Sequence, residues 1–167
     1  MKTRRKRADQ GIYKNREPVR NRGREERNAM GVTITATNPK YEFDMGYFGF
    51  FQLRKEIALA LDEEFGRNYA DLAHCHTQKE YATNDKAANR IIRENHLDRY
   101  ADVLDFLYMP DSEGGVGYKT CGNILRLIRN RKGGTGFRYG SMRHNDWEEF
   151  GEFLQDCYSH HKKMRWR

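Results

Sequence analysis

Cysteine and histidine residues form two short groups with the spacing of metal ligands. Cys157, His160 and His161 are three and four residues apart, so one face of a helix can present a thiolate and an imidazole. His74 or His76 can complete a tetrahedral zinc site. Cys157 equally fits an apolar helical stripe, and no CxxC or HExxH pattern accompanies the group. We therefore predict that the protein has no cofactor. The alternative hypothesis is a small zinc-binding protein or metalloenzyme in which this group binds zinc.

A glycine-rich segment that begins at Asp111 has features of phosphate and calcium loops. In a P-loop a glycine directly precedes the lysine, whereas here Tyr118 precedes Lys119. As an EF-hand counted from Asp111, the segment has Val116 where glycine is required and Gly122 where a bidentate glutamate is required. We interpret it as a connection between helices. Because no Ser, His and acid grouping is distinctive either, we predict that the protein is not an enzyme.

Positive charge is concentrated near the start of the chain. Residues 1–29 hold 11 Lys or Arg and four Asp or Glu, a balance of +7 that equals the net charge of the whole chain. Arginine binds phosphate through two donors at once and stacks on bases. Because large apolar residues are few, we predict that residues 1–30 are an intrinsically disordered arm. The arm residues expected to contact nucleic acid or a nucleoprotein are Arg4, Arg5, Lys6, Arg7, Lys14, Arg16, Arg20, Arg22 and Arg24.

Other interpretations of the arm remain open. It can be a solubilising tail, or it can dock on the protein's own residues 42–115, which hold eight basic and 15 acidic groups. A membrane-binding arm is disfavoured because no apolar helical face supports the charge. Residues 2–7 also have the composition of a nuclear import signal.

A second basic surface is predicted within residues 116–167, which hold 11 basic and five acidic groups. Glycines, cations and aromatic residues alternate over residues 129–140, which suits a loop that contacts phosphate and bases, although a β-hairpin explains the pattern equally well. Residues 162–167 extend the basic surface, and we expect Trp166 to pack on the core. The candidate contacts here are Arg126, Arg129, Arg131, Lys132, Arg138, Tyr139 and Arg143.

Periodicity predicts a mainly α fold with about five helices and a short strand or hairpin, forming a single compact domain over residues 31–167. The only clear strand is 32–37. Helices are expected over 47–65, 85–95, 97–108, 118–131 and 146–162, with Asn84 as the N-cap of the second and Asn145 at the start of the last. The aromatic run 47–51 suits base stacking, but we interpret it as core packing. Three cysteines are expected to be reduced thiols, and no apolar run is long enough to span a membrane.

Several segments together resemble small uncharacterised helical proteins carried by phages and prophages of Gram-positive bacteria. They are residues 41–58, Leu104-Asp-Phe-Leu, Asp111-x-x-Gly114, Cys121-x-x-Ile124 and Cys157-Tyr-x-His-x-Lys-x-Met-Arg-Trp166. The resemblance covers most of residues 31–167. Such relatives suggest an acidic Asp-x-Asp-Gly loop, whereas this chain has Asp111-Ser-Glu-Gly114. The resemblance implies a protein of the bacterial host cytoplasm that binds host machinery, such as an anti-CRISPR or other anti-defence protein.

Charge and resemblance together favour a non-enzymatic phage or mobile-element protein. It would bind nucleic acid or a host nucleoprotein complex, with no membrane partner, and inhibit a defence nuclease. A general nucleic-acid-binding regulator or packaging accessory is the first alternative, and it would bind free nucleic acid with strong salt dependence.

Overall fold

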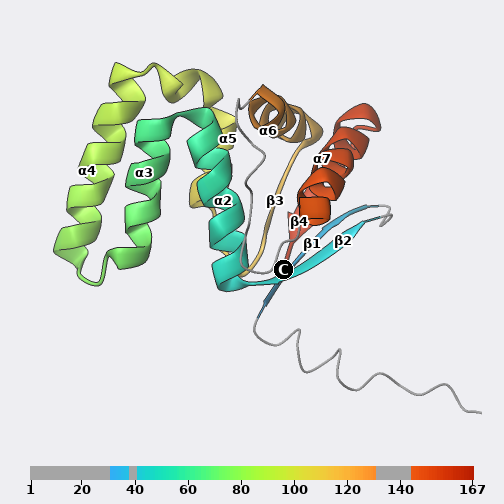
Figure 1. Cartoon of the computed structure of the whole chain (residues 1–167), viewed down its shortest axis with the longest axis horizontal. Helices are drawn as coiled ribbons and strands as arrows, with labels where there is room; N and C mark the ends of the chain where they lie inside the picture. Colours follow the sequence, from blue (N-terminus) through green and yellow to red (C-terminus); the bar gives the residue numbers. More distant parts are fainter. Residues whose placement is uncertain (1–30, 38–40, 131–143) are drawn as a thin grey trace, which may run out of the picture.

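The computed structural model describes residues 31–37, 41–130 and 144–167 (Figure 1). These ranges are mostly helical and include one small antiparallel sheet, so the mainly helical class is confirmed, while the expected single strand or hairpin is in fact four strands. In chain order the elements are β1 (Gly31–Ala36), β2 (Glu42–Gly46), α2 (Tyr47–Leu61), α3 (Glu63–Asp71), η2 (Leu72–His74), α4 (Gln78–Glu94), η3 (Leu97–Tyr100), α5 (Ala101–Tyr108), β3 (Gly114–Val116), α6 (Tyr118–Asn130), α7 (His144–Ser159) and β4 (Met164–Trp166).

The sheet has the strand order β2-β1-β4-β3, and all neighbouring strands are antiparallel. Side chains alternate between its two faces, as a β-strand requires. The inward residues are buried, for example Ile34 on β1 and Phe43 on β2. In this strand order β4 is a central strand between β1 and β3, although it follows the last helix in the sequence.

Helices cover the inward face of the sheet. Phe150 and Phe153 of α7 pack edge-on against Phe43, with ring centroids 5.7 and 5.5 Å away. Trp166 of β4 lies between Phe50 and Phe106, at centroid distances of 5.6 and 5.5 Å. Such T-shaped or tilted pairs are favourable arrangements for aromatic rings. The expected packing of Trp166 on the core is confirmed, since it is only 2% exposed.

Trp166 also explains the glycine at the start of β3. Its indole Nε1 donates a hydrogen bond to the Pro110 carbonyl oxygen at 2.9 Å, which fixes the ring. A Cβ at Gly114 would lie 2.2 Å from Cζ2 of this ring, far inside van der Waals contact. The segment connects α5 to α6 as expected, and it also contains the short strand β3, which needs a glycine for packing.

A buried arginine fixes the loop that leads into β3. Arg54 of α2 is 3% exposed and donates to the Met109 carbonyl oxygen at 2.7 Å and to Asp111 Oδ1 at 2.6 Å. Its guanidinium carbon lies 4.2 Å from the centre of the Phe50 ring, a cation–π arrangement. Burial lowers the pKa of Arg54, and the nearby Asp111 carboxylate opposes this shift.

Two expected helix boundaries are wrong. The helix predicted over 47–65 is divided at Asp62, whose side chain accepts a hydrogen bond from Phe65 N at 2.8 Å and starts α3. Helix α4 begins after Thr77, which forms a capping box with Glu80. Asn84, the expected N-cap, is instead buried inside α4.

The start of the last helix also differs. Helix α7 begins at His144, two residues before the predicted start, so position 145 lies within the helix. The other helices match the prediction closely, since residues 97–108 form η3 and α5, and α6 ends one residue before the predicted boundary. Within the described ranges, no helix has the length and apolar character that a bilayer span requires.

Candidate nucleic-acid interface

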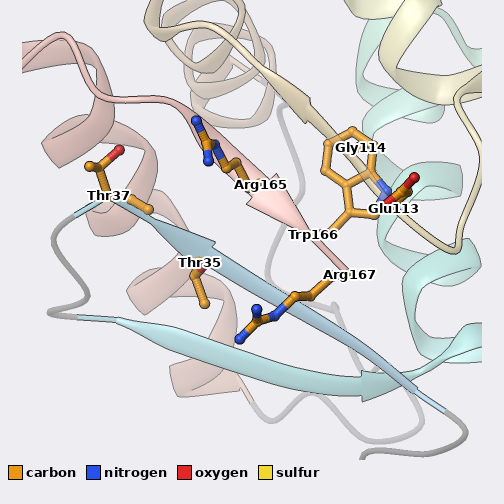
Figure 2. Close-up of a pocket in the computed structure, with 8 residues that line it drawn as sticks. Thr35, Thr37, Glu113, Gly114, Arg165, Trp166 and Arg167 are labelled. Carbon is orange, nitrogen blue, oxygen red and sulfur yellow. The ribbon is translucent and has the colours of Figure 1, made fainter.

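The outward face of the sheet is polar, and its negative and positive side chains lie on different strands. Cross-strand pairing aligns Glu42 with Thr35 and Thr35 with Arg165, and it aligns Asp44 with Thr33. From one edge to the other, the face therefore carries carboxylates on β2 (Glu42 and Asp44), hydroxyls on β1 (Thr33 and Thr35), arginines along β4 (Arg165 and Arg167) and Gly115 on β3. Figure 2 shows this face in front of the helices.

The arginines along β4 are what we call the β4 cations: Arg165 and Arg167. Arg167 continues the ladder beyond the strand, since its N–H donates to the Thr33 carbonyl oxygen at 3.3 Å and its own carbonyl oxygen accepts from Thr33 N at 2.9 Å. Both side chains are exposed, and within the described residues neither forms an ion pair. They are therefore available to an anionic ligand. Lys163, two residues before Arg165, is also exposed and adds a third charge nearby.

The carboxylates on β2 are partly engaged within the sheet. Thr33 Oγ1 donates to Asp44 Oδ1 at 2.7 Å. One strand of hydroxyls separates these carboxylates from the β4 cations, which is a gap of about 10 Å at the usual strand spacing. An anion on this face is therefore attracted toward β4 and repelled from β2.

Gly115 packs closely against β4. A Cβ at this position would lie 3.3 Å from Arg165 Cγ and 3.0 Å from the Met164 carbonyl oxygen. The stem of Arg165 thus lies directly against the backbone of β3.

A shallow depression of about 740 Å³ lies on the same face (Figure 2). It is lined by Thr35, Ala36, Thr37, Glu113, Gly114, Arg165, Trp166 and Arg167. Two guanidinium groups and two threonine hydroxyls are hydrogen-bonding groups suited to phosphate oxygens, while Glu113 is a single opposing carboxylate. The depression can accept a phosphate group more readily than an apolar ligand.

The attachment point of the basic arm lies at the end of the sheet where Arg167 pairs with Thr33. Residues 1–30 lie outside the described residues, but they are joined covalently to Gly31, the first residue of β1. Gly31 is two residues from Thr33, which pairs with Arg167. The arm is therefore attached to the fold close to Arg167.

The arginines predicted on α6 lie elsewhere. Arg126 donates to Asn123 and to the Gly122 carbonyl oxygen, and Arg129 donates to Gln155 Oε1 of α7 at 3.2 Å. Both are exposed, but α6 packs against α7, which covers the inward face of the sheet (Figure 1). The structure does not bring them to the β4 cations. The other predicted contacts, Arg131, Lys132, Arg138, Tyr139 and Arg143, lie outside the described residues.

The candidate zinc ligands are not assembled in the part of the chain that the structure describes. Cys157 is buried, and a hydrogen bond with the Cys121 thiol raises its pKa. His160 Nδ1 lies 3.0 Å from Asp156 Oδ1, and the ring of His161 packs on Tyr118. His74 lies in η2 and His76 lies just before α4. No group of three or more His, Cys, Asp or Glu in the described ranges is placed to hold a metal ion.

Sequence reasoning missed the outward sheet face. Its signal was present in residues 163–167, where Lys163, Arg165 and Arg167 alternate with Met164 and Trp166 in the period of a strand. A strand of only three residues is too short to stand out from such a pattern alone.

None of the protein-family models, curated proteins or solved structures compared with the chain matches it. Function must therefore be inferred from the residues themselves.

Proposed function

We propose that the protein binds nucleic acid without catalysing a reaction, and that the β4 cations and the basic arm contact the phosphate backbone. The observation that supports this most strongly is the pairing of Thr33 with Arg167, two residues from Gly31. Gly31, the residue to which the arm is joined, therefore lies close to Arg167 at one end of the outward sheet face.

The charge order of the face supports a directed mode of binding. Arginine forks bind phosphate with two hydrogen bonds, and the adjacent threonine hydroxyls can donate further ones. The β2 carboxylates would repel a backbone that crossed them. We infer that the bound strand runs along β4, away from these carboxylates.

We also propose a host nucleoprotein as the biological target, as an anti-defence protein would require. This part rests on the resemblance to phage and prophage proteins and on the charge of the arm. A regulator or packaging accessory that binds free nucleic acid is the competing proposal. Capture from a bacterial lysate with and without nuclease separates them, because only a contact with the protein components would survive nuclease treatment.

Direct binding measurements with paired variants test the proposed surface. Arg165→Gln with Arg167→Gln should weaken binding of the full chain to a labelled oligonucleotide at least tenfold, because charged hydrogen bonds contribute about 1.5–3 kcal/mol each. Arg93→Gln removes an exposed charge on α4, far from the sheet (Figure 1), and should change affinity little.

Variants of α6 distinguish the β4 surface from the basic surface that the sequence predicted at Arg126 and Arg129. If Arg126→Gln with Arg129→Gln weakens binding and the β4 double variant does not, the β4 surface is the wrong site. If no variant binds less tightly than the wild type, the described surface is not a nucleic-acid interface.

A further inference from the structure

Two aromatic rings are exposed at the start of α2. Phe48 is 68% exposed and Tyr47 is 47% exposed, whereas Phe50 is completely buried. Neither exposed ring belongs to the core cluster of the described residues. The interpretation of residues 47–51 as core packing therefore holds for Phe50 and for the half-buried Phe51, but not for the first two rings. A ligand that covers an exposed phenylalanine removes apolar area from water, which is favourable.

These rings lie at the end of the sheet that carries the arm and Arg167. Gly46, the residue before Tyr47, pairs with Gly31. The Cα atoms of Gly46 and Arg167 are separated by two strand spacings across the sheet and two residues along it, which corresponds to about 12 Å. A short stretch of nucleic acid can span this distance, so it can contact Arg167 and the start of α2 together.

We propose that the ligand of this surface is single-stranded nucleic acid, with a base stacked on Phe48 and the adjoining phosphates on Arg167 and Arg165. This inference rests on the proposed function and specifies its ligand. In a duplex the bases are paired and stacked on one another, so their flat faces are not available to a protein ring. Unpaired bases offer these faces, and combining aromatic rings with a positively charged groove is how proteins bind single strands without sequence preference. Tyr47 offers a second ring beside Phe48.

The outward face of the sheet itself supports this assignment. It offers threonine, arginine, glycine and carboxylate groups, so stacking surfaces come from α2 and charge comes from β4. Phosphate contacts alone would not distinguish a single strand from a duplex. Discrimination between the two must then depend on the exposed rings.

The test compares a fluorescently labelled single strand of mixed sequence with its own duplex, using the full chain and anisotropy to measure affinity. Phe48→Leu keeps an apolar side chain but removes the flat ring, and should weaken single-strand binding by about fivefold or more, the loss of one base–aromatic stack. Duplex affinity should not change. Phe48→Tyr should restore single-strand affinity, and Tyr81→Leu, which removes a 49% exposed ring on α4, should have no effect.

The outcomes separate this inference from the proposed function. If Phe48→Leu leaves single-strand binding unchanged while the β4 double variant weakens it, the stacking inference is overturned and the proposed function stands. Equal weakening of single-strand and duplex binding by Phe48→Leu would also overturn it. If the folded wild-type protein binds neither form, the proposed function itself fails. Circular dichroism of each variant verifies the fold.

Discussion

A methyl group at Gly114 would collide with the ring of Trp166 on the neighbouring strand β4. The ideal Cβ would lie 2.2 Å from Trp166 Cζ2 and 2.6 Å from Cε2, whereas carbon atoms normally approach to about 3.5–4.0 Å. Trp166 cannot easily move, because Phe50 and Phe106 flank it and its Nε1 hydrogen-bonds to Pro110. Relief of more than 1 Å of overlap must displace β3 from β4.

We expect Gly114→Ala to lower the free energy of unfolding by about 3 kcal/mol, the upper part of the usual range for overpacking. For a domain of this size, such a loss lowers the melting temperature by about 6–12 °C. Urea unfolding followed by tryptophan fluorescence measures it. Gly151→Ala in α7 is the matched control. Among the described residues, apart from its chain neighbours and the backbone of its own helix, no atom lies within 4 Å of its ideal Cβ, and alanine is the better helix former. A Gly114→Ala protein as stable as the wild type would refute the packing argument and reopen a ligand-binding role for this glycine.

Three further changes test other parts of the fold by the same unfolding titration. Arg54→Ala should lower the free energy of unfolding by about 3 kcal/mol through the cavity it leaves, and Arg54→Met by less, because its stem still fills the space between the rings; equal losses would contradict this. Burial raises the pKa of Tyr69, whose hydroxyl donates to the Leu107 carbonyl oxygen at 2.8 Å. The folded protein thus holds this proton more tightly than the unfolded chain. The contribution of Tyr69 to stability should therefore be constant below about pH 10, the ordinary pKa of tyrosine, and fall above it, so stability should fall less steeply with pH in Tyr69→Phe; identical slopes would rule out this residue. Thr77→Ala should cost about 1 kcal/mol by removing the N-cap of α4, and no loss would indicate that the capping box is unimportant.

The helices could be predicted because their apolar stripes are long and regular. In α6, Cys121, Ile124 and Leu125 recur at helical spacing, and all three are buried. Boundaries were less predictable, because caps depend on a few polar side chains. Thr77 with Glu80 forms the capping box that starts α4, whereas the apolar stripe of this helix begins only at Ala87 and favours Asn84 as the start.

The sheet could be predicted only in part. Strand β1 shows clear alternation of β-branched residues, whereas β3 and β4 contain three residues each and become strands only because they pair with each other and with β1. Such pairing joins Gly114 to Trp166 across the chain, which no local pattern can reveal. The order of charges on the outward face follows from this register, so the sequence indicated a basic C-terminal segment but not which residues would lie side by side.

The salt dependence of binding tests the central claim most directly. A protein that neutralises phosphates releases counterions, and each phosphate contact contributes about 0.7 to the slope of log affinity against log salt for a single strand and about 0.9 for a duplex. Removing both β4 cations, Arg165 and Arg167, should therefore reduce the slope by about 1.4–1.8, with no comparable change in Arg93→Gln. An unchanged slope in the β4 double variant, with the protein folded and the wild type binding, would contradict the assignment of this sheet face to the phosphate backbone.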